Sequence, residues 1–172
     1  MQLAGASVQK EALDCAQAAE SPQLMRGPLG PAGQPGRYIV ALLVGALLGI
    51  AVGLFATSTG LDRDRAFYPV VTIVTASYYA LFAVMGGSPH ALALESLVGT
   101  IFLATAVWGF KSSLWLVVAA LAAHAIFDLG RGTVVSNPGV PSWWPQFCLA
   151  IDVTLAAYLA WLLKSGRIRA AA

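Results

Sequence analysis

Long apolar runs separated by short polar segments make up the chain from Tyr38 onward. The runs cover about residues 38–57, 67–85, 91–110, 112–129 and 145–163. A transmembrane helix needs roughly 20 mostly apolar residues, which is close to the length of each run. None of the runs alternates between polar and apolar positions, as a strand of a membrane barrel would. Because lipid admits only helices and closed barrels as spanning structures, the pattern predicts five transmembrane helices.

The segments between the runs are short, which predicts that successive helices are antiparallel neighbours. Residues 86–89 read Gly-Gly-Ser-Pro, a turn signal. The longest connection covers residues 130–142 and contains Asn137-Pro138-Gly139. We therefore expect an all-α integral membrane bundle over residues 38–164, followed by a basic tail over residues 165–172.

Residues 1–37 differ from the rest of the chain. They contain four prolines, five glycines and mixed charges, a composition that predicts a disordered polar tail. No apolar segment of the secretory type follows the start. Met25 precedes Arg26, which leaves open that residues 1–24 are a mis-called start.

The overall composition agrees with a membrane protein. The 172 residues are 58% hydrophobic and 10% charged, with a mean hydropathy of +0.74, whereas a soluble domain has about 25% charged residues. The net charge of +2 is small and spread along the chain, which argues against a nucleic acid partner. The expected partner is the lipid bilayer. Cys15 and Cys148 are the two cysteines, and their positions predict no disulfide.

Lysines and arginines in the loops indicate the orientation, because cytoplasmic loops carry more of them. The side of the N-terminal tail carries four and the opposite side carries six. This difference predicts a cytoplasmic C-terminus. The four are Lys10, Arg26, Arg37 and Arg131, and the six are Arg63, Arg65, Lys111, Lys164, Arg167 and Arg169.

The first apolar run carries a glycine at every fourth position, at Gly45, Gly49 and Gly53. Such a stripe lets another helix approach closely. Packing within the bundle and a homodimer through the first span both remain open.

Ionisable side chains inside the apolar runs mark the candidate site. A charged side chain in hydrocarbon costs roughly 2.5–3.5 kcal/mol, so intramembrane acids are usually functional. Alternating helix directions place four such residues in one leaflet, with His124 and Asp128 on one helix face. The four are Glu95, His124, Asp128 and Asp152, and the predicted pocket around them adds Tyr78, Tyr79, Arg131, Asn137 and Cys148 under a lid of residues 130–144.

These side chains are compatible with several functions, and the sequence leaves open whether the protein is an enzyme. His124, Glu95 and Asp152 could ligate a divalent metal such as zinc, iron or manganese. Glu95 or Asp152 as acid and His124 as base, oriented by Asp128, could act on a lipophilic small molecule.

Two further classes do not require catalysis. The same groups could couple protons or cations to transport in a small transporter or binding subunit. In a structural assembly protein, Asp128 would pair with Arg131 and His124 would bond a backbone carbonyl.

Three motifs occur in the C-terminal half, about 30 residues in all: His124-x-x-x-Asp128, the Asn137-Pro138 loop, and Cys148-x-x-x-Asp152. In these motifs the chain resembles a family of small bacterial integral-membrane proteins of uncharacterised activity. It implies a polar intramembrane site in the bacterial inner membrane. The chain departs from the family at residues 129–131, where Leu-Gly-Arg replaces a further histidine, so a two-histidine metal site is not expected.

Overall fold

The structure is a computed structural model that describes residues 35–169. Within this range it is all-helical, with five helices long and apolar enough to cross a membrane. Each of the five corresponds to one apolar run, which confirms the prediction of an all-α membrane bundle. The predicted disordered tail falls almost entirely on residues 1–34, outside the described residues. The helices are α2 (Pro35–Thr59), α3 (Phe67–Met85), α4 (Pro89–Lys111), α5 (Leu114–Val134) and α6 (Trp144–Lys164), with a short 3-10 helix η2 (Leu61–Arg63) after α2.

The helix ends follow local signals. Ser88 caps α4, because its hydroxyl accepts a hydrogen bond from the Ala91 N–H at 3.2 Å, and Pro89 occupies the first turn. Ser113 caps α5 in the same way, by accepting from the Trp115 N–H at 3.4 Å. Both serines adopt the extended backbone expected at such positions.

Helix α5 extends beyond the predicted end near residue 129 and continues to Val134. The glycines at 130 and 132 do not stop it, since neither adopts a positive φ. Arg131, expected in a loop, is therefore helical, and the residue is only 5% exposed. This change moves one positive charge from the membrane surface into the bundle.

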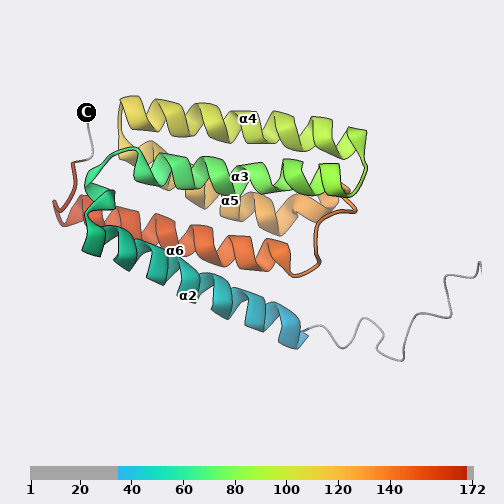
Figure 1. Cartoon of the computed structure of the whole chain (residues 1–172), viewed down its shortest axis with the longest axis horizontal. Helices are drawn as coiled ribbons and strands as arrows, with labels where there is room; N and C mark the ends of the chain where they lie inside the picture. Colours follow the sequence, from blue (N-terminus) through green and yellow to red (C-terminus); the bar gives the residue numbers. More distant parts are fainter. Residues whose placement is uncertain (1–34, 170–172) are drawn as a thin grey trace, which may run out of the picture. The chain divides into compact units, whose positions relative to one another are not determined.

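Successive helices run antiparallel (Figure 1). Helix α4 packs on α3, α5 packs on both α4 and α6, and α3 also contacts α5. The apolar core lies mainly between α3, α5 and α6. Its largest fully buried members are Tyr68, Leu114, Leu121, Leu155, Leu159 and Leu162.

The glycine stripe of α2 packs against α6. A Cβ on Gly49 would lie 2.9 Å from Thr154 Cβ, and one on Gly53 would lie 2.8 Å from the Tyr158 ring. A Cβ on Gly45 would meet the backbone carbonyl of Phe147. Of the two alternatives left open by the sequence, the structure therefore has these glycines packed within the chain.

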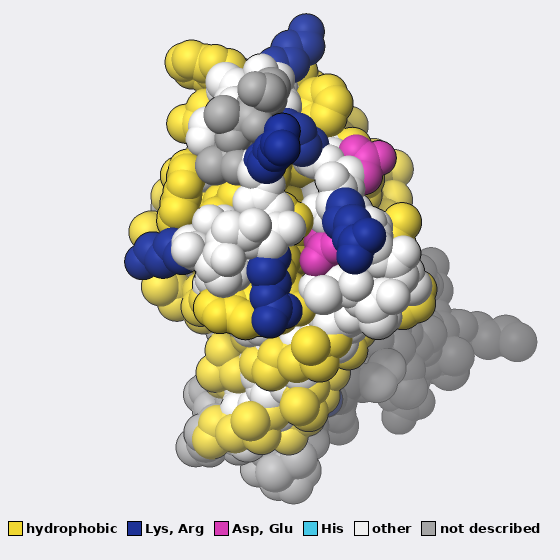
Figure 2. Space-filling view, turned by 90° about the vertical axis from the view of Figure 1, so that its left-hand side faces the viewer, with side chains coloured by type: hydrophobic (Ala, Val, Ile, Leu, Met, Phe, Trp, Pro, Cys, Tyr) yellow, Lys and Arg dark blue, Asp and Glu magenta, His cyan; other side chains and the backbone are white. Residues whose placement is uncertain are grey.

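The end of the molecule at which α6 finishes is strongly basic. Figure 2 views this end and shows lysine and arginine side chains spread across it. Arg65 lies among them and donates to the carbonyl oxygens of Phe110 at 3.1 Å and Arg169 at 3.2 Å. Arg65 thus ties the α4–α5 connection to the segment that follows α6.

Candidate functional site

Four potential metal ligands face one another between α5 and α6. Helix α5 contributes His124 and Asp128, and α6 contributes Cys148 and Asp152. Each pair is separated by four residues and so lies on one face of its helix. One ligand atom from each side chain lies within 4.8 Å of all the others. We call these four residues the α5–α6 cluster.

A short hydrogen bond connects the two helices at the centre of the cluster. His124 Nδ1 lies 2.6 Å from Asp152 Oδ2, at hydrogen-bond distance. The Cys148 thiol donates to the same carboxylate oxygen at 3.7 Å. Asp128 Oδ2 is 3.8 Å from His124 Nδ1. Both carboxylates are therefore directed at one imidazole.

The α5–α6 cluster is almost completely shielded. None of its four residues is more than 4% exposed. Phe102 of α4 meets the His124 ring edge-on, with the ring centroids 4.9 Å apart. Tyr79 of α3 donates its hydroxyl proton to Asp128 Oδ1. The surroundings are thus aromatic and apolar, so charge on the cluster is compensated by its own members or by a bound ion.

Two carboxylate oxygens of the cluster are unsatisfied. Asp128 Oδ2 and Asp152 Oδ1 are buried and have no hydrogen-bond partner among the described residues. Buried polar atoms nearly always have partners, and each unpaired one costs about 1–3 kcal/mol. Unpartnered oxygens beside an imidazole and a thiol are suited to ligating a cation.

A second polar group lies beside the cluster, at the end where α5 finishes. Arg131 Nη2 donates to Glu95 Oε1, and the pair joins α5 to α4. Asn137 Nδ2 also donates to Glu95 Oε1, at 3.3 Å. Glu95 and Arg131 are both buried, so removing their charges from water is costly. The additional hydrogen bond from Asn137 helps to offset this cost, as a stable buried ion pair requires.

Tyr79 connects this ion pair with the α5–α6 cluster. Its hydroxyl binds Asp128, while the Arg131 guanidinium lies 4.2 Å above its ring centroid. Its backbone carbonyl accepts from Asn137 Nδ2 at 3.0 Å. One buried tyrosine, 1% exposed, therefore touches both polar groups.

The loop between α5 and α6 is packed down on the end of α3. The Gly139 N–H donates to Asn137 Oδ1 at 3.2 Å. Gly139 approaches the Phe82 carbonyl so closely that a Cβ would collide with it. The predicted lid of residues 130–144 is thus in part helix α5 and in part this docked loop.

The structure brings together only part of the pocket predicted from the sequence. His124, Asp128, Asp152 and Cys148 meet, with Tyr79 and Arg131 adjacent. Glu95 is separate from them, because Arg131 and Asn137 hold it.

Other predicted neighbours take different partners. Tyr78 is 37% exposed and packs on Trp144, with the ring centroids 5.0 Å apart. The structural alternative would pair Asp128 with Arg131 and bond His124 to a backbone carbonyl. In the structure, Asp128 instead accepts from Tyr79, and His124 contacts Asp152.

Sequence reasoning missed a third polar group at the basic end. Asp62 is 5% exposed and accepts a hydrogen bond from the Thr57 hydroxyl at 2.6 Å. The Tyr158 hydroxyl lies 2.8 Å from the same threonine. In the sequence, Asp62 stands beside Arg63 and resembles a solvated loop residue. The polar side chains of Thr57 on α2 and Tyr158 on α6 could have indicated a polar group at this end.

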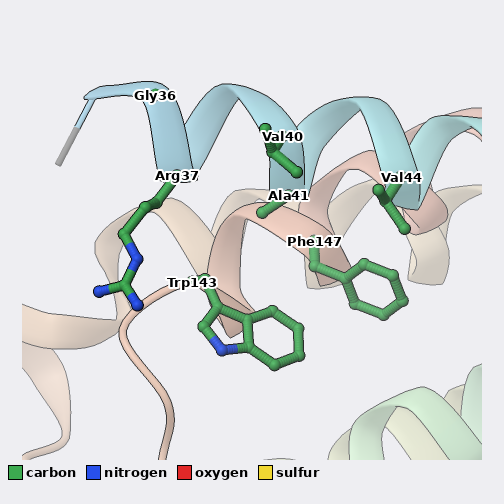
Figure 3. A pocket seen from close by; sticks show the side chains of 7 residues that line it. All are labelled: Gly36, Arg37, Val40, Ala41, Val44, Trp143 and Phe147. Carbon is green, nitrogen blue, oxygen red and sulfur yellow. The ribbon is translucent and has the colours of Figure 1, made fainter.

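Two grooves lie apart from the α5–α6 cluster. One, of about 510 Å³, separates the first turns of α2 and α6 and is lined almost entirely by apolar atoms; Arg37, Trp143 and Phe147 border it (Figure 3). The other, of about 230 Å³, lies between α3 and α4 and includes Glu95. Neither is lined by a member of the cluster.

Comparison with models of known protein families, with curated proteins and with solved structures finds no match to this chain.

Proposed function

We propose that this multi-pass membrane protein binds one divalent transition metal ion in the α5–α6 cluster, with zinc as the best fit. The observation that carries the proposal is the convergence of four potential ligand atoms within 4.8 Å. In addition, the two carboxylates of the cluster each have a buried oxygen without a partner among the described residues. The metal set expected from the sequence, His124, Glu95 and Asp152, is thereby changed: Asp128 and Cys148 take the place of Glu95.

Charge supports a divalent cation. Glu95 and Arg131 balance each other, so within residues 35–169 neither Asp128 nor Asp152 has an arginine or lysine partner. With both carboxylates ionised, the Cys148 thiol protonated and His124 neutral, the cluster carries two negative charges inside an apolar environment. A divalent ion would neutralise these two charges, and loss of the thiol proton on ligation would leave one net negative charge. Protonation is the alternative, and it would leave the cluster a set of interhelical hydrogen bonds.

The donor types support zinc over harder metals. One imidazole nitrogen, one thiol sulfur and carboxylate oxygens form the mixed donor set that zinc accepts in tetrahedral sites. Magnesium and calcium prefer oxygen alone, and manganese favours carboxylates over thiolate. To ligate the ion, the imidazole must be neutral and the thiol deprotonated, so binding would release protons, including the one that His124 and Asp152 share.

Tyr79 would act as the supporting residue of such a centre. Its hydroxyl already holds Asp128 Oδ1, which leaves Asp128 Oδ2 directed at His124. Partners of this kind orient ligating carboxylates and strengthen metal binding. The complete burial of the cluster fits a closed centre that stabilises the bundle.

The membrane and the orientation are also proposals. We place the protein in a bacterial inner membrane, on the resemblance of its C-terminal half, with its C-terminus in the cytoplasm. The end at which α6 finishes carries six lysines and arginines. On the opposite side, burial of Arg131 reduces the sequence count from four to three: Arg37, and Lys10 and Arg26 outside the described residues. A count of six against three supports a cytoplasmic C-terminus.

Metal analysis of the purified full chain tests the proposal. The protein is loaded with excess zinc in detergent, freed of unbound metal and measured by inductively coupled plasma mass spectrometry. We expect about one ion per chain, as for a site formed by the folded chain, and loss of most of it in His124→Ala and in Cys148→Ser. His90→Ala is the matched control, because His90 is exposed and is the other histidine of the chain.

A well-folded wild-type protein that retains no zinc, cobalt or manganese would overturn the metal proposal. So would equal metal content in His124→Ala and His90→Ala. Elution of each variant as a single detergent complex of wild-type size checks the fold, and Cys148→Ser serves if His124→Ala fails that check.

A further inference from the structure

The α3–α4 groove is a second site outside the α5–α6 cluster. It occupies about 230 Å³ and opens on the surface between the two helices. Small side chains create the hollow: Ala76, Ser77 and Ala80 on α3 face Ser96, Gly99 and Thr100 on α4. An apolar surface would be expected wherever this face meets lipid.

Glu95 gives the groove a buried acceptor. Glu95 is one of the residues that line the groove, and it is 1% exposed. Oxygen Oε1 accepts hydrogen bonds from Arg131 and Asn137, but Oε2 has no partner among the described residues. A buried carboxylate oxygen without a partner in hydrocarbon is costly, so a donor that enters the groove would be bound favourably.

The hydroxyl groups around the groove can also accept hydrogen bonds, because their own protons are already donated elsewhere. The Ser77 hydroxyl donates its proton to the Val74 carbonyl at 2.8 Å, and the Thr100 hydroxyl donates to the Ser96 carbonyl at 2.7 Å. Each hydroxyl oxygen keeps lone pairs that can accept another bond. The groove therefore offers acceptors and calls for a ligand with a hydrogen-bond donor.

We propose that the α3–α4 groove binds the hydroxyl end of a lipophilic alcohol from the bilayer. The hydroxyl would donate to Glu95 Oε2, and the first part of the chain would lie along the small residues of α3 and α4. A neutral donor fits better than a cation, because Arg131 already balances the charge of Glu95. At roughly 30 Å³ per water-sized group, the volume holds roughly eight such groups, enough for the head and the adjoining carbons.

A helix from a second copy of the chain is the competing occupant. Small and hydroxyl-bearing residues also line helix interfaces in membranes. In a second copy packed through the same face, the Ser77 and Thr100 hydroxyls already donate to carbonyls of their own helices, so neither supplies a donor to Glu95 Oε2. The alcohol is favoured for that reason, and the experiment separates the two occupants.

Photolabelling of the full chain tests the proposal. The protein is reconstituted in phosphatidylcholine nanodiscs with a sixteen-carbon primary alcohol that carries a diazirine near its hydroxyl end, and labelled peptides are mapped by mass spectrometry. We expect labelling on α3 and α4 around Ser77 and Thr100. Unlabelled hexadecanol should compete at least about tenfold better than its methyl ether, which cannot donate a hydrogen bond.

Gly99→Leu should abolish most of this labelling by filling the groove, since an added Cβ at Gly99 meets only the Ala76 carbonyl, at 3.7 Å. Gly132→Leu is the matched control, because Gly132 is exposed on α5 and has no atom within 4 Å of an added Cβ. Glu95→Gln, if it folds, should lower the preference for the alcohol over the ether.

Three results would overturn the proposal: equal competition by alcohol and ether, labelling unaffected by Gly99→Leu, or Ser96→Cys chains that form disulfide dimers and exclude the probe. The last result would assign the groove to a second copy. The metal content of the α5–α6 cluster is measured in the same samples, so failure here is distinguishable from failure of the metal proposal.

Discussion

Arg131 and Glu95 form a buried ion pair that joins α5 to α4 across 36 positions of the sequence. The pair neutralises the charge of each residue where no water is available, and Tyr79 and Asn137 assist it. It also explains why α5 continues past Gly130 to Val134. Ending the helix earlier would remove the guanidinium from its partner.

Breaking this ion pair should strongly destabilise the bundle. Arg131→Gln leaves the Glu95 carboxylate buried without a positive charge, a change that costs about 3–5 kcal/mol. The free energy of unfolding, measured by titration with sodium dodecyl sulfate in mixed micelles, checks this. Arg63→Gln, at an exposed position, should change it by less than about 0.5 kcal/mol.

The double variant Glu95→Gln/Arg131→Gln should recover part of the loss, because no uncompensated charge remains. A loss in Arg131→Gln no greater than that in Arg63→Gln would show that the pair contributes nothing to stability.

Removing the Tyr79 hydroxyl should weaken metal binding without removing a ligand. Tyr79→Phe takes away the donor that holds Asp128 Oδ1, and loss of such a supporting bond lowers affinity about 10–100-fold. Competition with a chelating dye measures the zinc affinity. Tyr78→Phe is the matched control, since Tyr78 is part-exposed and lies away from the cluster. Equal affinities in the two variants would contradict this role of Tyr79.

Cobalt should report on Cys148 directly. If Cys148 ligates the metal, the cobalt-loaded protein will show the absorption of thiolate-to-cobalt charge transfer. Cys148→Ser, which loses most of its metal, will lack that band even when cobalt is in excess. Cys15→Ser tests the remaining cysteine and should leave the spectrum unchanged. A spectrum that is identical in wild type and Cys148→Ser would remove the thiol from the ligand set.

Substitution of Gly45 should separate the packing of α2 from helix propensity. Alanine normally stabilises a helix relative to glycine by about 0.5–1 kcal/mol, but at Gly45 its Cβ would collide with the Phe147 carbonyl. Gly45→Ala should therefore destabilise the protein by about 1–3 kcal/mol. Gly36→Ala, where an added Cβ meets nothing within 4 Å, should be neutral or stabilising. Thermal unfolding in detergent measures both, and a gain at Gly45 would mean that α2 does not pack on α6 in this way.

Reporter fusions should place the C-terminus in the cytoplasm. In a bacterial host, green fluorescent protein fused after Ala172 should fluoresce, and alkaline phosphatase at the same position should be inactive, because the six lysines and arginines at this end favour the cytoplasmic side. The reverse result would invert the orientation and place the α5–α6 loop in the cytoplasm.

The sequence by itself determined the five spans and the pairing of residues within each helix. Apolar length is a local property, and lipid leaves a continuous apolar run of about 20 residues no other stable conformation than a helix. The helical repeat likewise placed His124 with Asp128 and Cys148 with Asp152, because residues four apart share a face whatever surrounds them. Tertiary structure alone decided which faces meet. From the sequence, either Glu95 or Asp128 could have paired with Arg131. The rotation of α4 and α5 against their neighbours decided that Arg131 pairs with Glu95 and that Asp128 binds Tyr79. That rotation is set by side-chain packing between helices distant in sequence, such as Phe102 against His124, and no local pattern of residues contains it.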